Sequence, residues 1–205
     1  VIDAGELGRP LVMHCAHRNP TVPPNFDSSM IVKDSLVHEV DVTRYLFDEE
    51  ITSVQIVKPS ANPGAPEGLQ DPQIAIFATE SGRHVDVEVF VTTGVAYEVR
   101  TEVVGERGSA MIGLDVGLVR KAASGQWGGQ ITPSFKERFG QAYDNEVQRW
   151  VDAVHQGGQT GDYTDGPSAW DGYAAAAVCE AGVESLDSGL PVDVTMIDRA
   201  SVQGA

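Results

Sequence analysis

The sequence predicts an α+β domain in which an open, mainly antiparallel β-sheet is covered on one face by helices. Three observations predict this fold class: strand-like runs follow one another from Ser53 to Leu114, short turns join them, and helical patterns precede and follow them. Connections this short join antiparallel neighbours, so we expect a meander of about five strands, extended by an earlier strand at Pro10–Asn19. The 205 residues are long enough to bury a sizeable core as a single domain, 1–205.

The composition is strongly acidic, with 14 Lys and Arg against 30 Asp and Glu and a formal charge of −16. Such a field repels phosphate backbones, so no nucleic-acid partner is expected. No apolar run approaches the roughly 20 residues that a transmembrane helix needs, and the opening residues VIDAGELG lack the features of a signal peptide. Cys15 and Cys179 fit buried free thiols, and we expect a cytoplasmic protein without a membrane partner.

The first elements lead to a polar strand end. Val1–Gly8 resembles the tail of a helix closed by glycine, and Pro10–Asn19 alternates as a strand. His17 and Asn19 lie on one side of this strand, just before the proline-rich loop Pro20–Asn25. Strand ends are where sheets present ligand-binding groups, although His17 and Asn19 would also serve as a turn-capping pair.

Ile31–Phe47 is predicted to be an amphipathic helix with Ser28 or Ser29 as its N-cap. One stripe contains Leu36, Val40, Thr43 and Phe47, and the opposite stripe contains Asp34, His38, Asp41 and Tyr45. A polar stripe of this kind is often a solvated face. Asp34 and His38 are nevertheless one turn apart and can share a ligand, a spacing that suits acid–base chemistry on a hydroxyl.

The strands that follow are Ser53–Lys58, Gln73–Thr79, Arg83–Thr92, Val95–Val104 and Ser109–Leu114. A Pro- and Gly-rich loop precedes the second of them, and Glu80–Arg83 closes a hairpin. The third strand has four valines on one face and His84, Asp86, Glu88 and Phe90 on the other. This second face is open, so we predict a homo-oligomer that packs through it.

Two helices complete the domain. Phe135–His155 has an apolar stripe, which includes Tyr143, and is expected to pack it against the core. Pro167–Ser188 is Ala-rich and is stopped by Gly189, after which Val192–Val194 reads as a last short strand.

No metal site is expected. His14 and His17 in MHCAHRN resemble metal ligands, but residues i and i+3 of a strand point to opposite faces. Asp34, His38 and Asp41 on the helix lack a third strong nitrogen or sulfur donor.

No nucleotide site is expected within this chain either. Gly125–Gly129 lacks the preceding strand and the following basic residue of a phosphate cradle, and neither a dinucleotide fingerprint nor a nucleophile elbow occurs. Tyr97 and Tyr143 lie among apolar neighbours, which favours packing, although the Tyr97 hydroxyl can also reach a pocket.

Three segments together resemble a known family. HCAHRNP (His14–Pro20) and VKDSLVHEVDVTRYL (Val32–Leu46) resemble the inositol 2-dehydrogenase branch of the Gfo/Idh/MocA oxidoreductases, and DGYAAAAVCEAGVESLDSGLPVDV (Asp171–Val194) is similar to that family's C-terminal helix and strand. The resemblance covers only the family's C-terminal substrate and oligomerisation domain. It implies that the N-terminal Rossmann domain is absent and that the chain is a C-terminal fragment of a longer two-domain protein.

The resemblance also implies roles for individual residues. His38 is the general base that takes a proton from a ring hydroxyl of myo-inositol while hydride leaves for NAD, and Asp34 orients the substrate and holds a catalytic lysine of the missing domain. The implied substrate-binding residues are Asn19, His17, Tyr97, Tyr143 and Asp144. NAD is bound by the missing domain, the oligomer is a tetramer formed through the open sheet face, and the fragment alone is inactive.

Two alternatives remain at this point. The parent protein can be a dehydrogenase of another sugar or cyclitol, because side chains on the pocket rim decide the substrate. The chain can also be a non-catalytic oligomerisation or ligand-binding module. Asp34 and His38 argue against that reading, since a pure scaffold does not need both on its non-core stripe.

Overall fold

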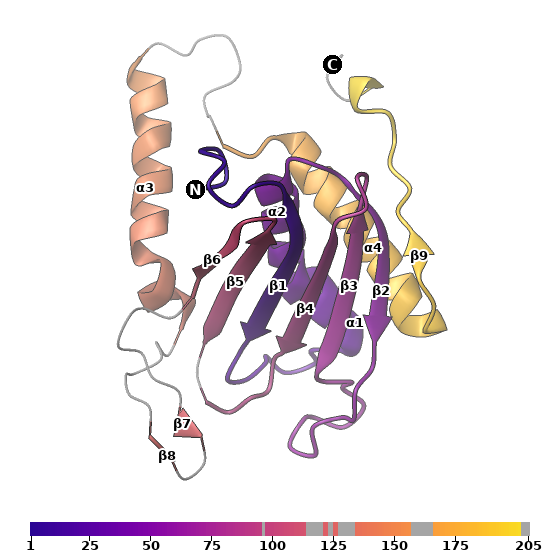
Figure 1. The fold of residues 1–205 in the computed structure, drawn as a ribbon. Helices are drawn as coiled ribbons and strands as arrows, with labels where there is room; N and C mark the ends of the chain where they lie inside the picture. The colour runs from indigo at the N-terminus through magenta and orange to yellow at the C-terminus, as the bar shows by residue number, and fades with distance from the viewer. Residues whose placement is uncertain (96, 114–120, 123–124, 127–133, 157–165, 202–205) are drawn as a thin grey trace.

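The computed structural model describes residues 1–95, 97–113, 121–122, 125–126, 134–156 and 166–201 (Figure 1). At its centre is a seven-stranded sheet in the order β6-β5-β1-β4-β3-β2-β9. These strands are β1 (Pro10–Arg18), β2 (Ile51–Val57), β3 (Gln73–Thr79), β4 (His84–Phe90), β5 (Glu98–Gly105), β6 (Gly108–Ile112) and β9 (Val192–Asp193). In a separate two-stranded sheet, β7 (Lys121–Ala122) pairs with β8 (Gly125–Gln126). β8 occupies the first two residues of Gly125–Gly129, where a glycine-rich loop was expected, and residues 127–129 lie outside the described part.

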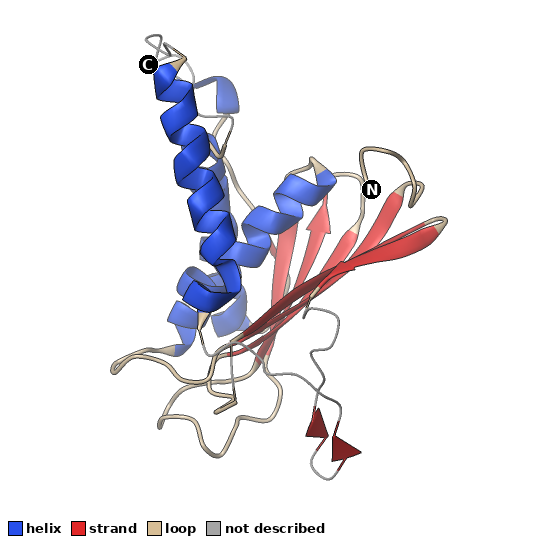
Figure 2. Ribbon diagram, turned by 90° about the vertical axis from the view of Figure 1, so that its left-hand side faces the viewer, coloured by secondary structure: helices blue, strands red, loops and turns tan. Residues whose placement is uncertain are grey.

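Helices cover one face of the large sheet and leave the other open, as Figure 2 shows. The helices that contact the sheet are the π-helix η1 (Ile31–Leu36), α2 (Val37–Phe47) and α4 (Ala169–Ser188). The other helical elements of the described part are α1 (Ser28–Met30), α3 (Phe135–His155) and the short 3-10 turn η2 (Arg199–Ser201). Apart from the parallel pair β1–β4, neighbouring strands are antiparallel, so the expected α+β fold class is confirmed. Within the described ranges, no helix has the length and apolar character needed to cross a bilayer.

The expected meander is wrong at one point, because β1 is inserted between β4 and β5. β1 runs parallel to β4 and antiparallel to β5. Thr93 and Gly94, expected to form a tight hairpin turn, instead pass around the end of β1: the Thr93 and Gly94 amides donate to the Asn19 and Pro20 carbonyls at 3.0 and 2.9 Å. The two strands are therefore separated by the width of one strand, and β1 satisfies the backbone groups of both.

The helix expected over Val1–Gly8 is also wrong, since these residues form successive turns. Gly5 and Gly8 have φ values of +68° and +69°, in the left-handed region that glycine adopts without steric cost. Two left-handed residues in so short a stretch interrupt any helical hydrogen-bond pattern.

The helical segment after the proline-rich loop begins at Asp27, not at Ser28 or Ser29 as expected. The Asp27 carboxylate accepts hydrogen bonds from the Ser29 and Met30 amides at 2.8 and 3.0 Å, which is the usual role of an N-cap. The expected single α-helix contains a π-helical stretch, η1, before α2. Such i→i+5 turns are rare and occur often at functional sites.

The apolar stripe of this helix is buried as expected, at Leu36, Val40, Thr43 and Phe47. It packs against α4 and the helix-facing side of the sheet, whose valines on β4 are at most 1% exposed. Cys15 and Cys179 are buried free thiols, as expected. By contrast, the expected packing of α3 is wrong: none of its residues is buried, and Val147 and Trp150 are 59% and 52% exposed.

A guanidinium network joins α2 to β2 and α4. Arg44 donates from Nε and Nη2 to the two carboxylate oxygens of Glu50 at 2.6 and 2.9 Å, and from Nη1 to Asp171 at 2.9 Å. Trp170 Nε1 donates to the same Glu50 carboxylate at 2.9 Å. Because bidentate charge-assisted bonds of this kind are strong, this network fixes the position of α4 relative to α2.

Acid is expected to weaken this junction. The hydrogen bond from Arg44 lowers the pKa of Glu50 from its ordinary value of 4.5. For Asp171, burial alone would raise the pKa. Hydrogen bonds from Ser168 and Arg44 outweigh this effect and lower the pKa from 3.8 to about 2. Carboxyl groups with lowered folded-state pKa values contribute stability above their unfolded values and lose it as pH falls through the folded ones. We therefore expect the free energy of unfolding in urea to fall from about pH 4.5 to about pH 2.

The variant Arg44→Met tests this pH dependence, because it keeps the length of the side chain but removes the cation. It should reduce the dependence of the unfolding free energy on pH across this window, since Glu50 and Asp171 then titrate nearer their ordinary values. Equal pH dependence in the wild type and in Arg44→Met would contradict this account.

Candidate active site

A cavity of about 680 Å³ lies between the end of β1, the η1–α2 helix, the start of β5 and the start of α3. Six of the seven residues proposed from the sequence line it, namely His17, Asn19, Asp34, His38, Tyr97 and Tyr143. The seventh, Asp144, is exposed on α3 and does not line the cavity. Strand, helix and loop residues that are far apart in the sequence thus meet at one place.

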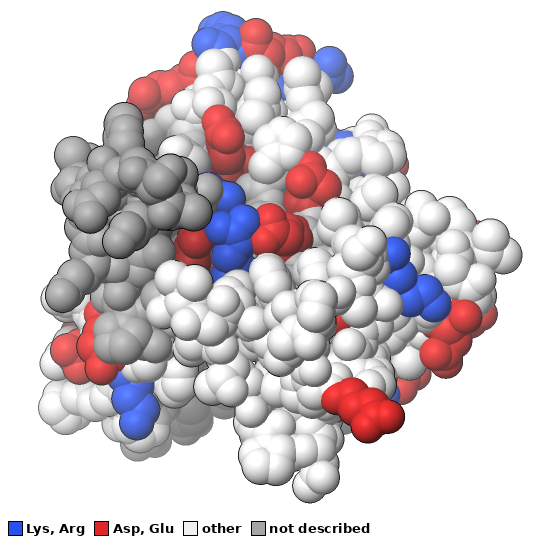
Figure 3. All heavy atoms as spheres, turned by 90° about the horizontal axis from the view of Figure 1, so that it is seen from below, with Lys and Arg blue, Asp and Glu red and all other residues white. Residues whose placement is uncertain are grey.

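The charged residues that line the cavity within the described part of the chain are acidic, namely Asp34, Glu39 and Asp41. No Lys or Arg is among the described residues that line it. Figure 3 views the end of the sheet where β1 and β4 finish, and the surface there is largely uncharged, with charged side chains in small separate groups. The cavity therefore offers hydrogen-bonding groups suited to a neutral polar ligand and no cation for a phosphate.

The polar stripe of the helix faces this cavity. Asp34 in η1 and His38 in α2 are both exposed and both line it. Among the described residues, no hydrogen bond joins the Asp34 carboxylate to the His38 imidazole, so both groups are open to a ligand. An imidazole with a carboxylate one turn away can accept a proton from a bound hydroxyl and stabilise the resulting positive charge.

His17 stands behind His38 in the cavity wall. β1 places it on the helix-facing side of the sheet, where it is 2% exposed. Its ring stacks on His38 with centroids 5.9 Å apart and an interplanar angle of 11°, and the edge of Tyr97 meets it at 5.9 Å. The two imidazoles are thus held in a fixed mutual orientation.

A residue that the sequence reading missed completes this wall. The Glu39 side chain is buried, and its Oε1 lies 2.9 Å from Nδ1 of His17. A signal for it exists in the sequence, because Glu39 follows Leu36 by three residues and precedes Thr43 by four, which places it on the buried stripe. A carboxylate on that stripe needs a partner, and His17 supplies it.

The aromatic side of the cavity is built by Tyr97, which directly precedes β5, and by the first turns of α3. Tyr97 makes edge contacts with Phe135 and Phe139 at 6.3 and 6.2 Å, and Phe135 does so with Tyr143 at 6.4 Å. Burial, and then the Glu39 carboxylate, raise the pKa of Tyr97 to about 12. Its phenol therefore stays protonated at neutral pH and can donate a hydrogen bond.

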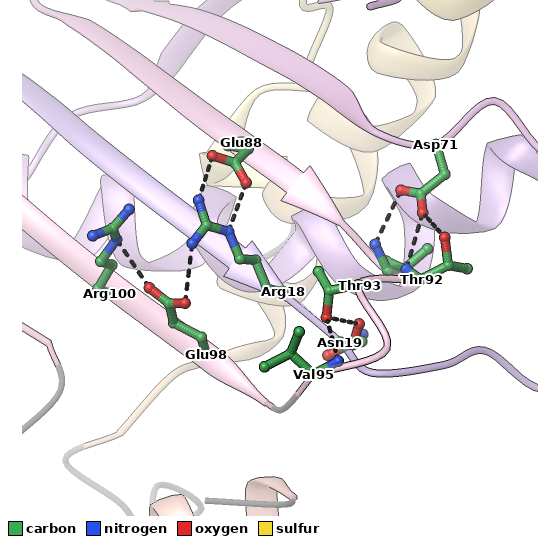
Figure 4. Close-up of polar contacts among 10 residues, drawn as sticks. Arg18, Asn19, Asp71, Glu88, Thr92, Thr93, Val95, Glu98 and Arg100 are labelled. Carbon is green, nitrogen blue, oxygen red and sulfur yellow. Dashed lines mark hydrogen bonds and ion pairs between the residues drawn. The ribbon is translucent and has the colours of Figure 1, made fainter. Parts of the chain in front are cut away.

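Asn19 is held at the strand end by its main chain. Its amide donates to the Phe90 carbonyl at 3.0 Å, and its carbonyl accepts from the Thr93 amide and hydroxyl at 3.0 and 2.9 Å (Figure 4). The side-chain oxygen Oδ1 is buried and has no hydrogen-bond partner within the described part of the chain. A buried amide oxygen without a partner beside a cavity is a plausible acceptor for a ligand hydroxyl.

The metal-like cluster MHCAHRN is divided between the two faces of the sheet. His14 lies on the open face, where its Nδ1 is 2.5 Å from an Asp86 carboxylate oxygen, whereas His17 is buried under the helices. The two imidazoles therefore cannot bind one ion. Over the ranges that the structure describes, no group of three His, Cys, Asp or Glu residues could hold a metal.

Residues 1–194 match a family model described as the oxidoreductase family, C-terminal alpha/beta domain. Inositol 2-dehydrogenase 1 of Mycolicibacterium vanbaalenii is 75% identical over 205 residues, covering 100% of this chain and 60% of that protein. Inositol 2-dehydrogenase of Rhodococcus erythropolis is 76% identical, covering 100% of this chain and 59% of that protein.

Among solved structures, the crystal structure of myo-inositol dehydrogenase from Lactobacillus casei in complex with NAD(H) and myo-inositol matches with a TM-score of 0.85. It is 36% identical, and the match covers 96% of this chain and 57% of that chain. The chain thus spans about 60% of the length of the relatives that it matches.

Proposed function

Because the chain belongs to the Gfo/Idh/MocA oxidoreductases through their C-terminal alpha/beta domain, we propose that it is the substrate and oligomerisation domain of an NAD-dependent inositol 2-dehydrogenase. The proposed reaction oxidises a ring hydroxyl of myo-inositol to a ketone. One observation carries the proposal: His38 and Asp34 open into the same cavity as His17, Asn19 and Tyr97. These residues offer both hydrogen-bond donors and acceptors, and the hydroxyl groups of a polyol can pair with either.

In the proposed mechanism, His38 accepts the proton of the reacting hydroxyl. Asp34, one turn away, orients the substrate and offsets the positive charge that forms on the imidazole. The neutral phenol of Tyr97 and the side-chain oxygen of Asn19 hold further hydroxyls of the ring. Tyr143 contributes to the aromatic wall, and Asp144 is proposed as a substrate contact only through the family resemblance.

The hydride acceptor comes from outside this chain. When bound, NAD would supply the acceptor for the hydride that leaves the carbon. The described residues of the cavity include no Lys or Arg for a pyrophosphate, so we assign the NAD site to an N-terminal nucleotide-binding domain, which would also supply the catalytic lysine. Calorimetry of the 205-residue chain with NAD should accordingly show no saturable binding.

The function is tested by joining the chain to the N-terminal part that its relatives possess and by following NADH formation. The substrates are myo-inositol, scyllo-inositol and glucose, each with NAD and with NADP. Fastest NADH formation with myo-inositol supports the proposal, and fastest formation with glucose would indicate a dehydrogenase of another sugar. A protein that binds a polyol without oxidising it would be a non-catalytic module.

We also propose that a second copy of the chain covers the open sheet face, in a tetramer. Ile74 and Ile76 lie half-buried on this face among charged residues that are already paired within the chain. Arg18 donates to both carboxylate oxygens of Glu88 at 2.6 and 2.7 Å and to Glu98 at 3.0 Å (Figure 4). Charges compensated in this way can be covered at a lower desolvation cost than free ones.

The variant Ile76→Lys tests this interface. Ile76 lies across from Asp86, so the ammonium is tolerated within one protomer but must lose its water at a subunit contact. In sedimentation velocity, we expect the Ile76→Lys protein to sediment as a smaller assembly than the wild type. Its circular dichroism spectrum should be the same as that of the wild type. Glu184→Lys, an exposed change on the helix-covered side, is the control and should leave the assembly intact. An unchanged assembly with Ile76→Lys would rule out this interface.

A further inference from the structure

Glu39 and His17 form a buried acid–imidazole pair behind the proposed base. Both side chains are 3% exposed, and Nδ1 of His17 is 2.9 Å from Oε1 of Glu39. The pair is in contact with the cavity, because both residues line it. It is also in contact with the proposed base through the stacked rings of His17 and His38.

The surroundings of this pair disfavour a net negative charge. The second carboxylate oxygen of Glu39, Oε2, is buried and has no hydrogen-bond partner in the described part of the chain. Over the ranges that the structure describes, no Lys or Arg lines the cavity beside it. A buried carboxylate with one hydrogen bond and no cation is costly, so the imidazole is the group that compensates it.

If the pair of Glu39 and His17 has no net charge, Nε2 of His17 carries a hydrogen. In one neutral form, an ionised Glu39 faces a His17 imidazolium, and in the other, a protonated Glu39 donates to Nδ1 of a neutral His17. These two forms differ only in where the proton lies between Oε1 and Nδ1, and both have a hydrogen on Nε2. Nε2 is an acceptor only when the pair carries a net charge of −1.

We propose that Glu39 is a positioning residue that keeps a hydrogen on Nε2 of His17, so that His17 donates a hydrogen bond to a hydroxyl oxygen of the ligand. Among the described residues, Nε2 has no other partner, and the ring lies in the cavity wall. Glu39 does not touch the ligand in this arrangement and acts through His17. The substrate aspect of this inference rests on the proposed dehydrogenase function, whereas the protonation of the pair does not.

The proton state of the pair is tested first on the 205-residue chain itself, without any activity. Long-range proton–nitrogen NMR correlations distinguish a protonated from an unprotonated Nε2, and His17→Gln identifies the His17 signals among those of the five histidines. We expect a protonated Nε2 at pH 7 in the wild type. An unprotonated Nε2 in the wild type would overturn the proposal, whatever the enzyme assay shows.

The role in binding is tested in the full-length enzyme by a double-mutant cycle of Glu39→Gln and His17→Gln. Loss of one charge-assisted hydrogen bond corresponds to a rise of about tenfold in the KM for the polyol. Because Glu39 acts through His17, Glu39→Gln should raise KM in the wild-type background and change it by less than about twofold when His17 is already glutamine. An equal effect of Glu39→Gln in both backgrounds would overturn the proposal. An enzyme inactive with every polyol would refute the proposed function and leave the NMR result to decide on the pair.

Discussion

Replacing His38 with alanine is expected to lower kcat of the full-length enzyme by roughly 10² to 10⁴-fold, the usual contribution of a general base. His38 is the exposed imidazole in the cavity, whereas His17 is buried and engaged by Glu39. The polar stripe also brings two carboxylates to the cavity, Asp34 and Asp41, but a carboxylate is a much weaker base than an imidazole and is a poor substitute as the acceptor of a hydroxyl proton. KM should change much less than kcat, because His38 acts mainly in the transition state.

The measurement is the initial rate of NADH formation at saturating myo-inositol, with His38→Gln as a second variant that fills the space without a basic nitrogen. Tyr45→Ala is the matched control, because Tyr45 lies two turns further along the same stripe, is 82% exposed and does not line the cavity. It should retain the wild-type rate. A His38→Ala enzyme that keeps more than about a tenth of kcat would exclude His38 as the base. A loss of assembly, with the chemistry intact, would exclude it equally.

The faces of the strands could be predicted from the sequence, but their order could not. Alternation along Pro10–Asn19 correctly puts Met13 and Cys15, which are buried, on the opposite side of the strand from His14, although it does not say which side the helices cover. The same alternation is compatible with any neighbour in the sheet, because it specifies a face and not a partner. The short link after β4 suggested a hairpin, yet it wraps around the end of β1 and holds Asn19.

A similar distinction applies to the helices. The spacing of Leu36, Val40 and Phe47 correctly predicts the buried stripe of α2, and the periodicity of α3 correctly predicts an amphipathic helix. Periodicity identifies an apolar face without identifying what covers it, so the packing of α3 against the core could not follow from the sequence.

Site residues that lie close together in the sequence could be predicted from it. Asp34 and His38 are one helical turn apart, and His17 and Asn19 share the end of one strand. The pairing of His17 with Glu39 joins residues 22 positions apart on different elements, so it depends on how α2 packs on β1. An acidic residue on a buried stripe is the one local indication that such a partner exists.

Replacing Asp71 with alanine is expected to lower the free energy of unfolding by about 3 kcal/mol or more, the largest loss of stability that we predict for a single substitution. Asp71 is 0% exposed, and its carboxylate accepts hydrogen bonds from the Val91 and Thr92 amides at 3.0 and 2.9 Å and from the Thr92 hydroxyl (Figure 4). Alanine would leave these donors without a partner where water reaches them poorly. For a chain of this size, the melting temperature should fall by roughly 10 °C.

The same carboxylate has a consequence for the proposed active site. Val91 and Thr92 begin the connection from β4 to β5, in which Thr93 binds Asn19 and Tyr97 reaches the cavity. Loosening this connection at Asp71 should therefore raise the KM for the polyol as well as lower stability. Thermal and urea unfolding followed by circular dichroism measure the first effect, and Asp187→Ala, an exposed change on α4, is the control. An Asp71→Ala chain that unfolds within about 0.5 kcal/mol of the wild type would mean that solvent replaces these bonds and that the connection is held by its backbone contacts to β1 alone.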